Sequence, residues 1–255
     1  MQKFNLYSLD IEWMNIIKLG GSVITNKNEY KSLNLDTLKR LVDELPKEDF
    51  ILVHGAGSFG HILAKKYDLT NGVKNNQKGF AEVHRDVMEL NSKVIDVLLQ
   101  RGINAISIPP NAFYTKGENF SCEIFDKYLE SGFVPVSFGD VVLDNEKGMS
   151  ICSGDYIILE LARRYSPDKV IFVADVDGVF DKNPKIYEDA KLLDVYEDAE
   201  FEEEVDDVTG SLKAKVEVMK EISTMCEKTI VINGKVDGRL RDALAGKDVI
   251  GTVIK

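Results

Sequence analysis

The sequence predicts an α/β protein with a mainly parallel sheet that helices cover on both faces. Short apolar runs alternate with segments of helical periodicity along almost the whole chain of 255 residues. This alternation is typical of parallel sheets between two helical layers. Glycine-rich turns follow two of the apolar runs directly, which predicts ligand-binding loops at the carboxyl ends of those strands.

The predicted strands are short apolar runs bounded by glycine or polar residues. Asn15–Leu19 is the first and ends at Gly20-Gly21, and Phe50–His54 is apolar enough for burial on both faces. The further strands are Ala105–Ile108, Phe133–Phe138, Lys169–Ala174, Thr229–Ile232 and Gly251–Ile254. A polar turn also predicts a hairpin, between Val141–Leu143 and Met149–Cys152.

The predicted helices carry apolar residues three or four positions apart. The longest, Ala81–Arg101, ends at Gly102, a residue that is common just after a helix. The others are Leu33–Leu45, Phe59–Tyr67, Cys122–Glu130, Tyr156–Tyr165, Ser211–Glu227 and Arg239–Ala245. We expect the one internal boundary near Ser166-Pro167.

The charge of the chain argues against two classes of partner. With 32 basic and 43 acidic residues the net charge is −11, whereas proteins that bind nucleic acids or anionic membranes need a basic face. Eleven acidic residues and one lysine fall between Glu188 and Asp207, so the rest of the chain is close to neutral. We interpret that segment as a solvated face or loop, with no bearing on the substrate.

The cysteines and the N-terminus predict a cytoplasmic protein without a membrane partner. Cys122, Cys152 and Cys226 are far apart and odd in number, so they offer neither a disulfide framework nor a zinc-binding spacing. Residues 1–13 contain two acidic residues and lack the apolar stretch of a signal peptide. No apolar run approaches the roughly 18 residues that suggest a membrane span. The sequence thus gives no set of metal-ligating side chains.

Two glycine loops predict a site for phosphate groups. Gly20–Ser22 follows the first strand, and Gly55–His61 follows the second and runs into a helix. Glycines let the backbone approach a ligand, and a helix N-terminus offers free N–H groups to an anion. Gly55–Gly60 matches the dinucleotide pattern G-x-G-x-x-G, but residues 75–78 contain neither the acidic residue nor the strand that this fingerprint requires. A Walker-type P-loop is excluded because Gly-Lys-Ser/Thr is absent from the sequence.

Lysines beside these loops favour phosphoryl transfer, which depends on positioning and on neutralising the charge of the moving group. Lys18 precedes the first loop and Lys27 follows it, while Lys213 and Lys215 follow a further turn at residues 209–211. Asp155 begins a predicted helix, so it is either a first-turn acid that the helix dipole favours or a carboxylate that orients the lysines or helps to hold magnesium.

The three histidines have different expected roles. His61 lies in the first turn after a glycine loop, where it can donate a hydrogen bond to an anionic substrate. His54, at a strand end, and His84, on the longest helix, are interpreted as structural.

Together these motifs resemble the amino acid kinase family, from about Asn15 to Ile254. The matching pieces, in chain order, are Lys18–Lys27, His54–His61, Ser153–Asp155, Asp175–Pro184, Asp207–Gly210, Asn233-Gly234 and Gly251-Thr252. His61 within Gly-Ser-Phe-Gly-His is similar to the branch that phosphorylates isopentenyl phosphate, and also to the fosfomycin kinases of the same family.

The resemblance implies a three-layer αβα sandwich that dimerises through its N-terminal half. Residues 14–165 would bind the acceptor, residues 166–255 would bind ATP, and residues 1–13 would be an extension that we expect to be dispensable. The implied reaction transfers the γ-phosphoryl group of ATP, with Mg²⁺, to isopentenyl phosphate, and dimethylallyl phosphate is a second candidate acceptor. It would serve an alternative mevalonate route of isoprenoid synthesis.

The resemblance also implies residue roles by position. The catalytic residues would be Lys18, Lys27, His61, Asp155 and Lys215. Among them Lys27 would stabilise charge in the transition state, and Asp155 would orient the lysines. ATP would be bound by Lys18, Gly20, Gly21, Ser22, Gly57, Asp175, Phe180, Gly210 and Lys215. The acceptor phosphate would be bound by Ala56, Gly57, His61 and Gly154.

Other functions stay open. A kinase for another phosphate or phosphonate, such as fosfomycin, fits the same motifs. A nucleotide-binding regulator without catalysis is disfavoured because Lys18, Lys27, Asp155 and Lys215 are all present. A carboxylate kinase is disfavoured because its acceptor has no phosphate for His61. Candidates for the walls of a prenyl pocket, each more consistent with core packing, are Phe80, Val83, Ile108 and Phe113.

Overall fold

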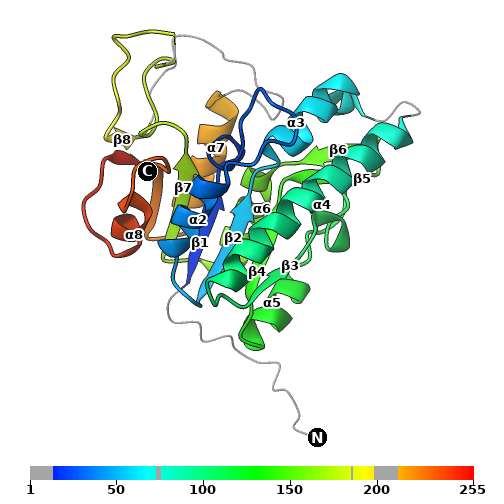
Figure 1. Cartoon of the computed structure of the whole chain (residues 1–255), viewed down its shortest axis with the longest axis horizontal. Helices are drawn as coiled ribbons and strands as arrows, with labels where there is room; N and C mark the ends of the chain where they lie inside the picture. The colour runs from blue at the N-terminus through cyan, green and yellow to red at the C-terminus, as the bar shows by residue number, and fades with distance from the viewer. Residues whose placement is uncertain (1–13, 73–75, 185, 198–211) are drawn as a thin grey trace, which may run out of the picture.

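The computed structural model describes residues 14–72, 76–184, 186–197 and 212–255. Its main strands are β1 (Asn15–Leu19), β2 (Phe50–His54), β3 (Ala105–Ser107), β4 (Val134–Phe138), β7 (Lys169–Ala174), β8 (Val195–Tyr196), β9 (Lys228–Asn233) and β10 (Gly251–Ile254). Within the described residues they form one sheet in the order β3-β4-β2-β1-β7-β9-β10-β8 (Figure 1). Neighbouring strands are parallel except β9 and β10, so the predicted mainly parallel sheet is confirmed.

Helices cover both faces of this sheet. They are α1 (Gly21–Ile24), α2 (Leu35–Asp43), α3 (Gly57–Lys66), α4 (Gln77–Gln100), α5 (Glu123–Glu130), α6 (Gly154–Tyr165), α7 (Leu212–Ser223) and α8 (Arg239–Leu244), with short 3-10 turns at η1 (Leu69–Asn71) and η2 (Pro110–Ala112). In Figure 1, α2 and α4 lie in front of the sheet and α6 lies behind it. Among the described helices, none combines the length and the apolar character of a membrane span.

Two apolar cores separate the three layers. Alternate residues of a strand point to opposite faces. Ile17 and Leu52 therefore pack with α2, α4 and α8, while Ile16 and Ile51 pack with α5, α6 and α7. All four side chains are completely buried, which confirms a three-layer αβα sandwich.

The predicted hairpin forms outside the main sheet. It consists of the antiparallel strands β5 (Asp140–Asp144) and β6 (Gly148–Cys152). Asp144 accepts hydrogen bonds from the backbone N–H groups of Glu146 and Lys147 at 2.8 and 2.9 Å, which closes the turn. The hairpin packs on α4 and follows directly after the carboxyl end of β4.

The structure corrects several predicted boundaries. Gly21 starts the short helix α1, where the sequence indicates only a loop. Helix α7 ends at Ser223, earlier than predicted, where the hydroxyls of Ser223 and Thr224 bond to backbone carbonyls three residues back and compete with the helical pattern. The two-residue strand β8 was not predicted. Residues 1–13, Gly210 and Ser211, and the acidic residues from 198 to 207 lie outside the described residues.

Strand order places a crevice at the end of β1. The chain passes from β1 to β2 on one side and later returns to β7 on the other, so connections diverge at β1. Ligands of open α/β sheets bind at such a switch point, beyond the carboxyl ends of the strands. Those ends of β1, β2 and β7 lie toward the top of Figure 1. Because β1 pairs with β7 along its whole length, residues 14–165 and 166–255 share one continuous sheet.

Candidate active site

A cavity of about 270 Å³ lies at the carboxyl ends of β1, β2 and β7. Both glycine loops line it, together with the start of α6 and part of α7. Of the predicted site residues, the cavity brings together Lys18, Gly20, Gly21, Ser22, Lys27, Ala56, Gly57, His61, Gly154, Asp155, Asp175 and Lys215. Segments that lie far apart in the sequence therefore meet where the glycine pattern predicted a ligand.

The two glycine loops touch each other through their backbones. A Cβ atom on Gly21 would lie 2.5 Å from the backbone nitrogen of Gly57, and a Cβ atom on Gly55 would lie 2.6 Å from that of Gly21. Such distances exclude any side chain at these positions. Gly57 also has a positive φ of 50°, which glycine adopts at little cost. The glycines thus let the two glycine loops share one cavity wall.

Thr25 joins the two loops with hydrogen bonds. Its hydroxyl donates to the carbonyl oxygen of Gly21 at 2.6 Å and accepts from the backbone N–H of Ser58 at 3.0 Å. Ser58 lies in the first turn of α3, where N–H groups have no partner within the helix. The threonine therefore fixes the N-terminus of α3 against the first loop.

Lys18 and Asp155 form an ion pair on the cavity wall. Their Nζ and Oδ1 atoms are 2.5 Å apart, and their side chains are 16% and 8% exposed. Ser153 caps α6 by accepting from the N–H of Tyr156 at 3.2 Å, which places Asp155 in the first helical turn. Asp155 therefore combines two of the roles that the sequence left open. It is a first-turn acid of α6, and it orients a lysine. Charge-assisted pairs of this kind hold a flexible lysine in one direction.

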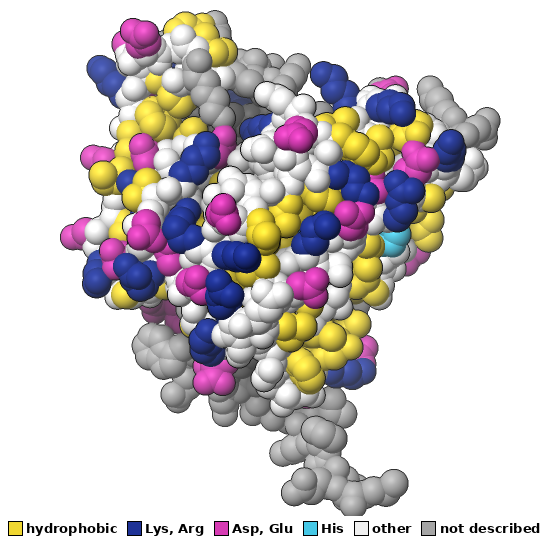
Figure 2. All heavy atoms as spheres, in the orientation of Figure 1, with side chains coloured by type: hydrophobic (Ala, Val, Ile, Leu, Met, Phe, Trp, Pro, Cys, Tyr) yellow, Lys and Arg dark blue, Asp and Glu magenta, His cyan; other side chains and the backbone are white. Residues whose placement is uncertain are grey.

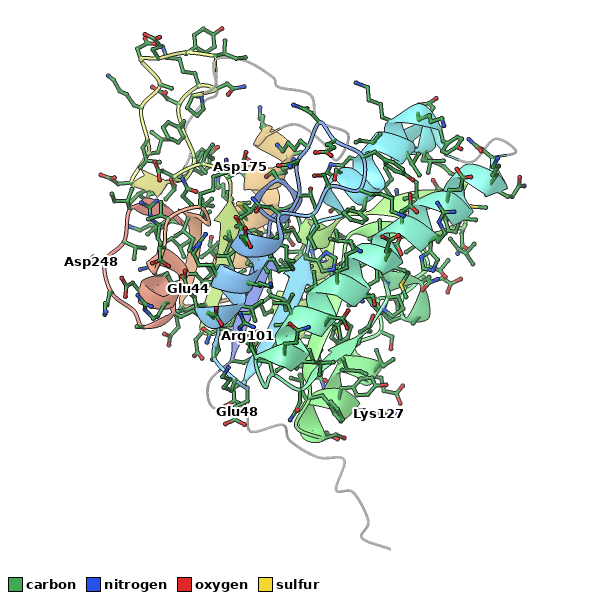
Figure 3. All side chains as sticks on the ribbon, in the orientation of Figure 1. Glu44, Glu48, Arg101, Lys127, Asp175 and Asp248 are labelled. Atoms are coloured by element: carbon green, nitrogen blue, oxygen red, sulfur yellow. The ribbon has the colours of Figure 1, made fainter. Side chains whose placement is uncertain are left out.

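One side of the cavity carries apolar side chains from β7, β9 and α7. Ser22 Oγ donates to Asp175 Oδ1 at 2.9 Å, which connects the first glycine loop to the end of β7. Asp175 is labelled there in Figure 3. Beyond it the apolar lining residues are Phe172, Val176, Val179, Val216, Met219 and Val231. Phe180 is outside the set of described residues that line the cavity, and its backbone forms an isolated bridge with Leu192.

The opposite side carries His61 and the start of α6. His61, Ala56 and Gly154 line this part, and a Cβ atom on Gly139 would lie 3.3 Å from the backbone nitrogen of Gly154. Backbone N–H groups and an imidazole therefore converge from α3 and α6. Such an arrangement suits an anion such as a phosphate group.

Asp140 is a cavity residue that the sequence analysis missed. It lines the cavity directly after Gly139, and its Oδ2 lies 2.6 Å from His84 Nδ1, while its Oδ1 has no hydrogen-bond partner within the described part of the chain. Burial raises the pKa of Asp140, and the hydrogen bond to Asp140 raises the pKa of His84. The available signal was a Gly-Asp pair directly after the fourth predicted strand.

His54 has the structural role that its position indicates. It is completely buried, and its Nε2 lies 3.2 Å from Asn91 Oδ1. Burial lowers its pKa to about 4, so the imidazole is neutral at physiological pH.

Val83 is the one prenyl-pocket candidate among the described lining residues. It belongs to an apolar cluster with Ala64, Val141 and Ile151, which also line the cavity. Ile108 and Phe113 instead pack in the core behind the sheet, and Phe80 packs against a smaller apolar cluster. Core packing is therefore confirmed for Ile108 and Phe113.

The cavity suits a magnesium ion that arrives with phosphate groups. Within the described residues no group of three or more acidic, histidine or cysteine side chains converges to hold a metal. Three carboxylates, Asp140, Asp155 and Asp175, nevertheless line the cavity, and Asp140 among them is paired with His84. Magnesium is commonly held by one or two carboxylates and the oxygens of a nucleotide, and these residues fit that mode.

Comparisons with known proteins agree with this geometry. The amino acid kinase family matches over residues 13–233. The isopentenyl phosphate kinase of Methanothermobacter thermautotrophicus is 39% identical over 94% of this chain and 98% of its own length, and that of Thermoplasma acidophilum is 38% identical over 95% and 100%. A crystal structure described as isopentenyl phosphate kinase superposes with a TM-score of 0.83 at 37% identity, and covers 95% of this chain and 100% of that one. The chain belongs to the amino acid kinase family.

Proposed function

We propose that the protein is a kinase that transfers the γ-phosphoryl group of ATP to isopentenyl phosphate, giving isopentenyl diphosphate and ADP. The observation that carries this proposal is the single cavity in which two touching glycine loops, three lysines and His61 converge. Relatives named isopentenyl phosphate kinase, 38–39% identical over nearly the whole chain, support the choice of acceptor.

The two sides of the cavity suggest how the ligands bind. ATP would place its base against the apolar side chains of β7, β9 and α7, and its phosphates near Lys18, Gly20–Ser22 and Lys215. The acceptor phosphate would bind at His61, the start of α3 and Gly154. In this assignment residues 166–255 bind the base of the nucleotide, and residues 14–165 bind the acceptor and contribute Lys18 and Gly20–Ser22 to the ATP phosphates. The prenyl tail would lie against Val83 and its apolar neighbours.

The reaction needs positioning more than proton transfer. A phosphate monoester is already ionised near neutral pH, so one of its oxygens can attack the γ-phosphorus while the bond to the oxygen of ADP breaks. Lysines that are held in place stabilise the charge on the moving group. Lys18, oriented by Asp155, and Lys27 would serve this role. Mg²⁺, held by the nucleotide with Asp155 or Asp175, would supply further charge neutralisation.

Further features belong to the same proposal. Apolar side chains of the N-terminal half, Leu99 and Phe133, are 51% and 40% exposed and are consistent with a homodimer that forms through this half. Apolar side chains gather around α4 and α5 on the face in Figure 2, where acidic and basic side chains are otherwise interspersed. The three cysteines are free thiols, which supports a location in a reducing cytoplasm. The product would enter isoprenoid synthesis by an alternative mevalonate route.

A coupled assay of ADP release tests the proposal. Purified protein with Mg·ATP is offered isopentenyl phosphate, dimethylallyl phosphate or fosfomycin. We expect rapid turnover of isopentenyl phosphate. Turnover of fosfomycin alone would mean that fosfomycin, and not isopentenyl phosphate, is the acceptor. ADP release that does not depend on any acceptor would contradict a phosphate kinase.

A further inference from the structure

The segment that carries Lys27 is a closed loop. Residues 26–33 are here called the Lys27 loop, and a backbone bridge between Thr25 and Leu33 closes it. The N–H of Asn34 donates to the carbonyl of Ile24 at 2.7 Å, and the N–H of Asn26 to that of Ser32 at 3.0 Å. Lys27 reaches the cavity from this loop, although it is an exposed residue. The position of Lys27 Nζ therefore depends on what holds the tip of the loop.

A buried carboxylate on α4 holds that tip. Tyr30 donates its hydroxyl to Asp86 Oδ2, and Lys31 Nζ lies 3.2 Å from Asp86 Oδ1. Arg85 adds two hydrogen bonds to the same Oδ1, at 2.9 and 2.7 Å. The side chain of Asp86 is completely buried. Lys31 also pairs with Glu89, one turn farther along α4.

Asp86 is charged although it is buried. Burial alone would raise its pKa, but the hydrogen bonds from Tyr30, Arg85 and Lys31 hold the pKa below its ordinary value. Burying a carboxylate costs free energy that such partners offset. Helix α4 does not need this charge for its own packing, because apolar residues such as Val87 and Leu90 already bury its inner face. Apart from Arg85, the partners of Asp86 among the described residues all belong to the Lys27 loop.

We propose that Asp86 is a positioning residue: through Tyr30 and Lys31 it holds the Lys27 loop so that Lys27 meets the transferring phosphoryl group. This inference rests on the proposed kinase function. Errors of about 1 Å in the position of a catalytic group can cost about 100-fold in rate. Loosening the tip should therefore lower kcat while the binding of both substrates persists.

The variant Tyr30→Phe tests the proposal with little risk to folding. It removes one hydroxyl at a residue that is 47% exposed. Tyr67→Phe is the matched control, because the Tyr67 hydroxyl donates at 2.5 Å to Glu82, one turn before Asp86 on the same helix, and Tyr67 lies outside the Lys27 loop. We expect Tyr30→Phe to lower kcat about tenfold, with both KM values within about twofold, and Tyr67→Phe to keep kcat. Equal kcat values in the two variants would overturn the proposal.

A double variant shows whether Tyr30 acts through Lys27. Lys27→Ala removes the group that the loop positions, so adding Tyr30→Phe should cause no further loss of kcat. A second, independent tenfold loss in the double variant would mean that Tyr30 affects the rate by another route. Asp86→Asn should reproduce the kcat loss of Tyr30→Phe and also lower the melting temperature.

Hydrogen exchange separates this inference from the proposed function. The backbone amides of residues 26–33 should exchange faster in Tyr30→Phe than in Tyr67→Phe, in the absence of any substrate. If the wild-type protein phosphorylates none of the acceptors but this difference is found, the proposed function fails and the anchoring of the loop stands. Equal exchange in the two variants would overturn the anchoring itself.

Discussion

The two sides of the cavity are built in different ways. The side that we propose for the acceptor is fixed by polar contacts between segments far apart in the chain, such as Thr25 with Ser58 and His84 with Asp140. The side that we propose for the nucleotide is largely a set of apolar side chains from β7, β9 and α7, with Ser22–Asp175 at its edge. A phosphate that must attack in line needs a fixed direction, whereas an aromatic base needs apolar area. The comparison indicates that the polar side orients its ligand for reaction, whereas the apolar side mainly supplies binding energy.

The largest effect is expected where the two sides meet, at Lys18. Asp155→Asn removes the charge that orients Lys18 and should lower kcat about 100- to 1,000-fold, the usual range for a lost electrostatic contact in a transition state. Steady-state kinetics with Mg·ATP and isopentenyl phosphate measure it. Asp126→Asn, which breaks an ion pair with Arg164 outside the cavity, serves as control and should keep kcat. A kcat in Asp155→Asn within threefold of wild type would contradict this role.

A reciprocal pair of variants sharpens the comparison of the two sides. His61→Ala should lower kcat/KM for the acceptor about 10- to 100-fold and leave the Kd for ATP unchanged, because a hydrogen bond to a charged group is lost on one side only. Lys215→Ala should weaken ATP binding and leave the acceptor KM within about twofold. Calorimetric titration with ATP and steady-state kinetics measure the pair. If both variants weaken the same ligand, the assignment of the two sides is wrong.

The sequence predicted the elements that form the cavity better than the contacts that complete it. The bounds of β1, β2 and β7 follow from apolar runs that must be buried on both faces. The glycine loops were visible in the sequence because the close approach of Gly21 to Gly57 requires glycine at these positions. Strand β10 runs antiparallel to β9, and no local sequence pattern indicates this direction. The prediction of Phe180 as a nucleotide contact stays untested.

Long-range polar contacts also escape a sequence analysis. Asp140 joins His84 across 56 residues, and Asp86 joins Tyr30 across the same separation. Neither pair has a spacing that distinguishes it from solvated surface charges. Only the fold brings these side chains together and buries them, so their roles follow from the structure alone.

A smaller effect, on the free energy of unfolding, is expected at the contact between α2 and α8. This contact joins residues 14–165 to residues 166–255. Glu44, labelled in Figure 3, accepts from the N–H groups of Gly238, Leu240 and Arg241 at 3.0–3.1 Å. Glu44→Gln should lower the free energy of unfolding by about 1–3 kcal/mol, because buried N–H groups lose a charged acceptor. Urea unfolding measures it.

Glu48 provides the matched control for this variant. It is an exposed glutamate a few residues away and is also labelled in Figure 3. Glu48→Gln should change the free energy of unfolding by less than about 0.5 kcal/mol. If the two variants are equally stable, Glu44 does not stabilise the contact between α2 and α8.

The smallest expected effect concerns the β5–β6 hairpin in acid. Hydrogen bonds from Ser150 and from the turn lower the pKa of Asp144 to about 2, from an ordinary value of 3.8. A lowered pKa in the folded state stabilises the protein above pH 3.8, and this stabilisation is lost as the pH falls toward 2. Asp144→Asn should therefore melt at a lower temperature than wild type at pH 6, with the gap narrowing toward pH 3. A gap that does not change with pH would exclude this linkage.

The central claim is that one cavity brings an ATP phosphate and an acceptor phosphate together for direct transfer. Phosphorus NMR of the protein with Mg·ATP and isopentenyl phosphate tests it most directly, because it identifies the products rather than ADP alone. We predict that the signals of isopentenyl diphosphate and ADP grow together, in equal amounts, while inorganic phosphate stays at its background level. Growth of ADP with inorganic phosphate, and no isopentenyl diphosphate, would contradict the account.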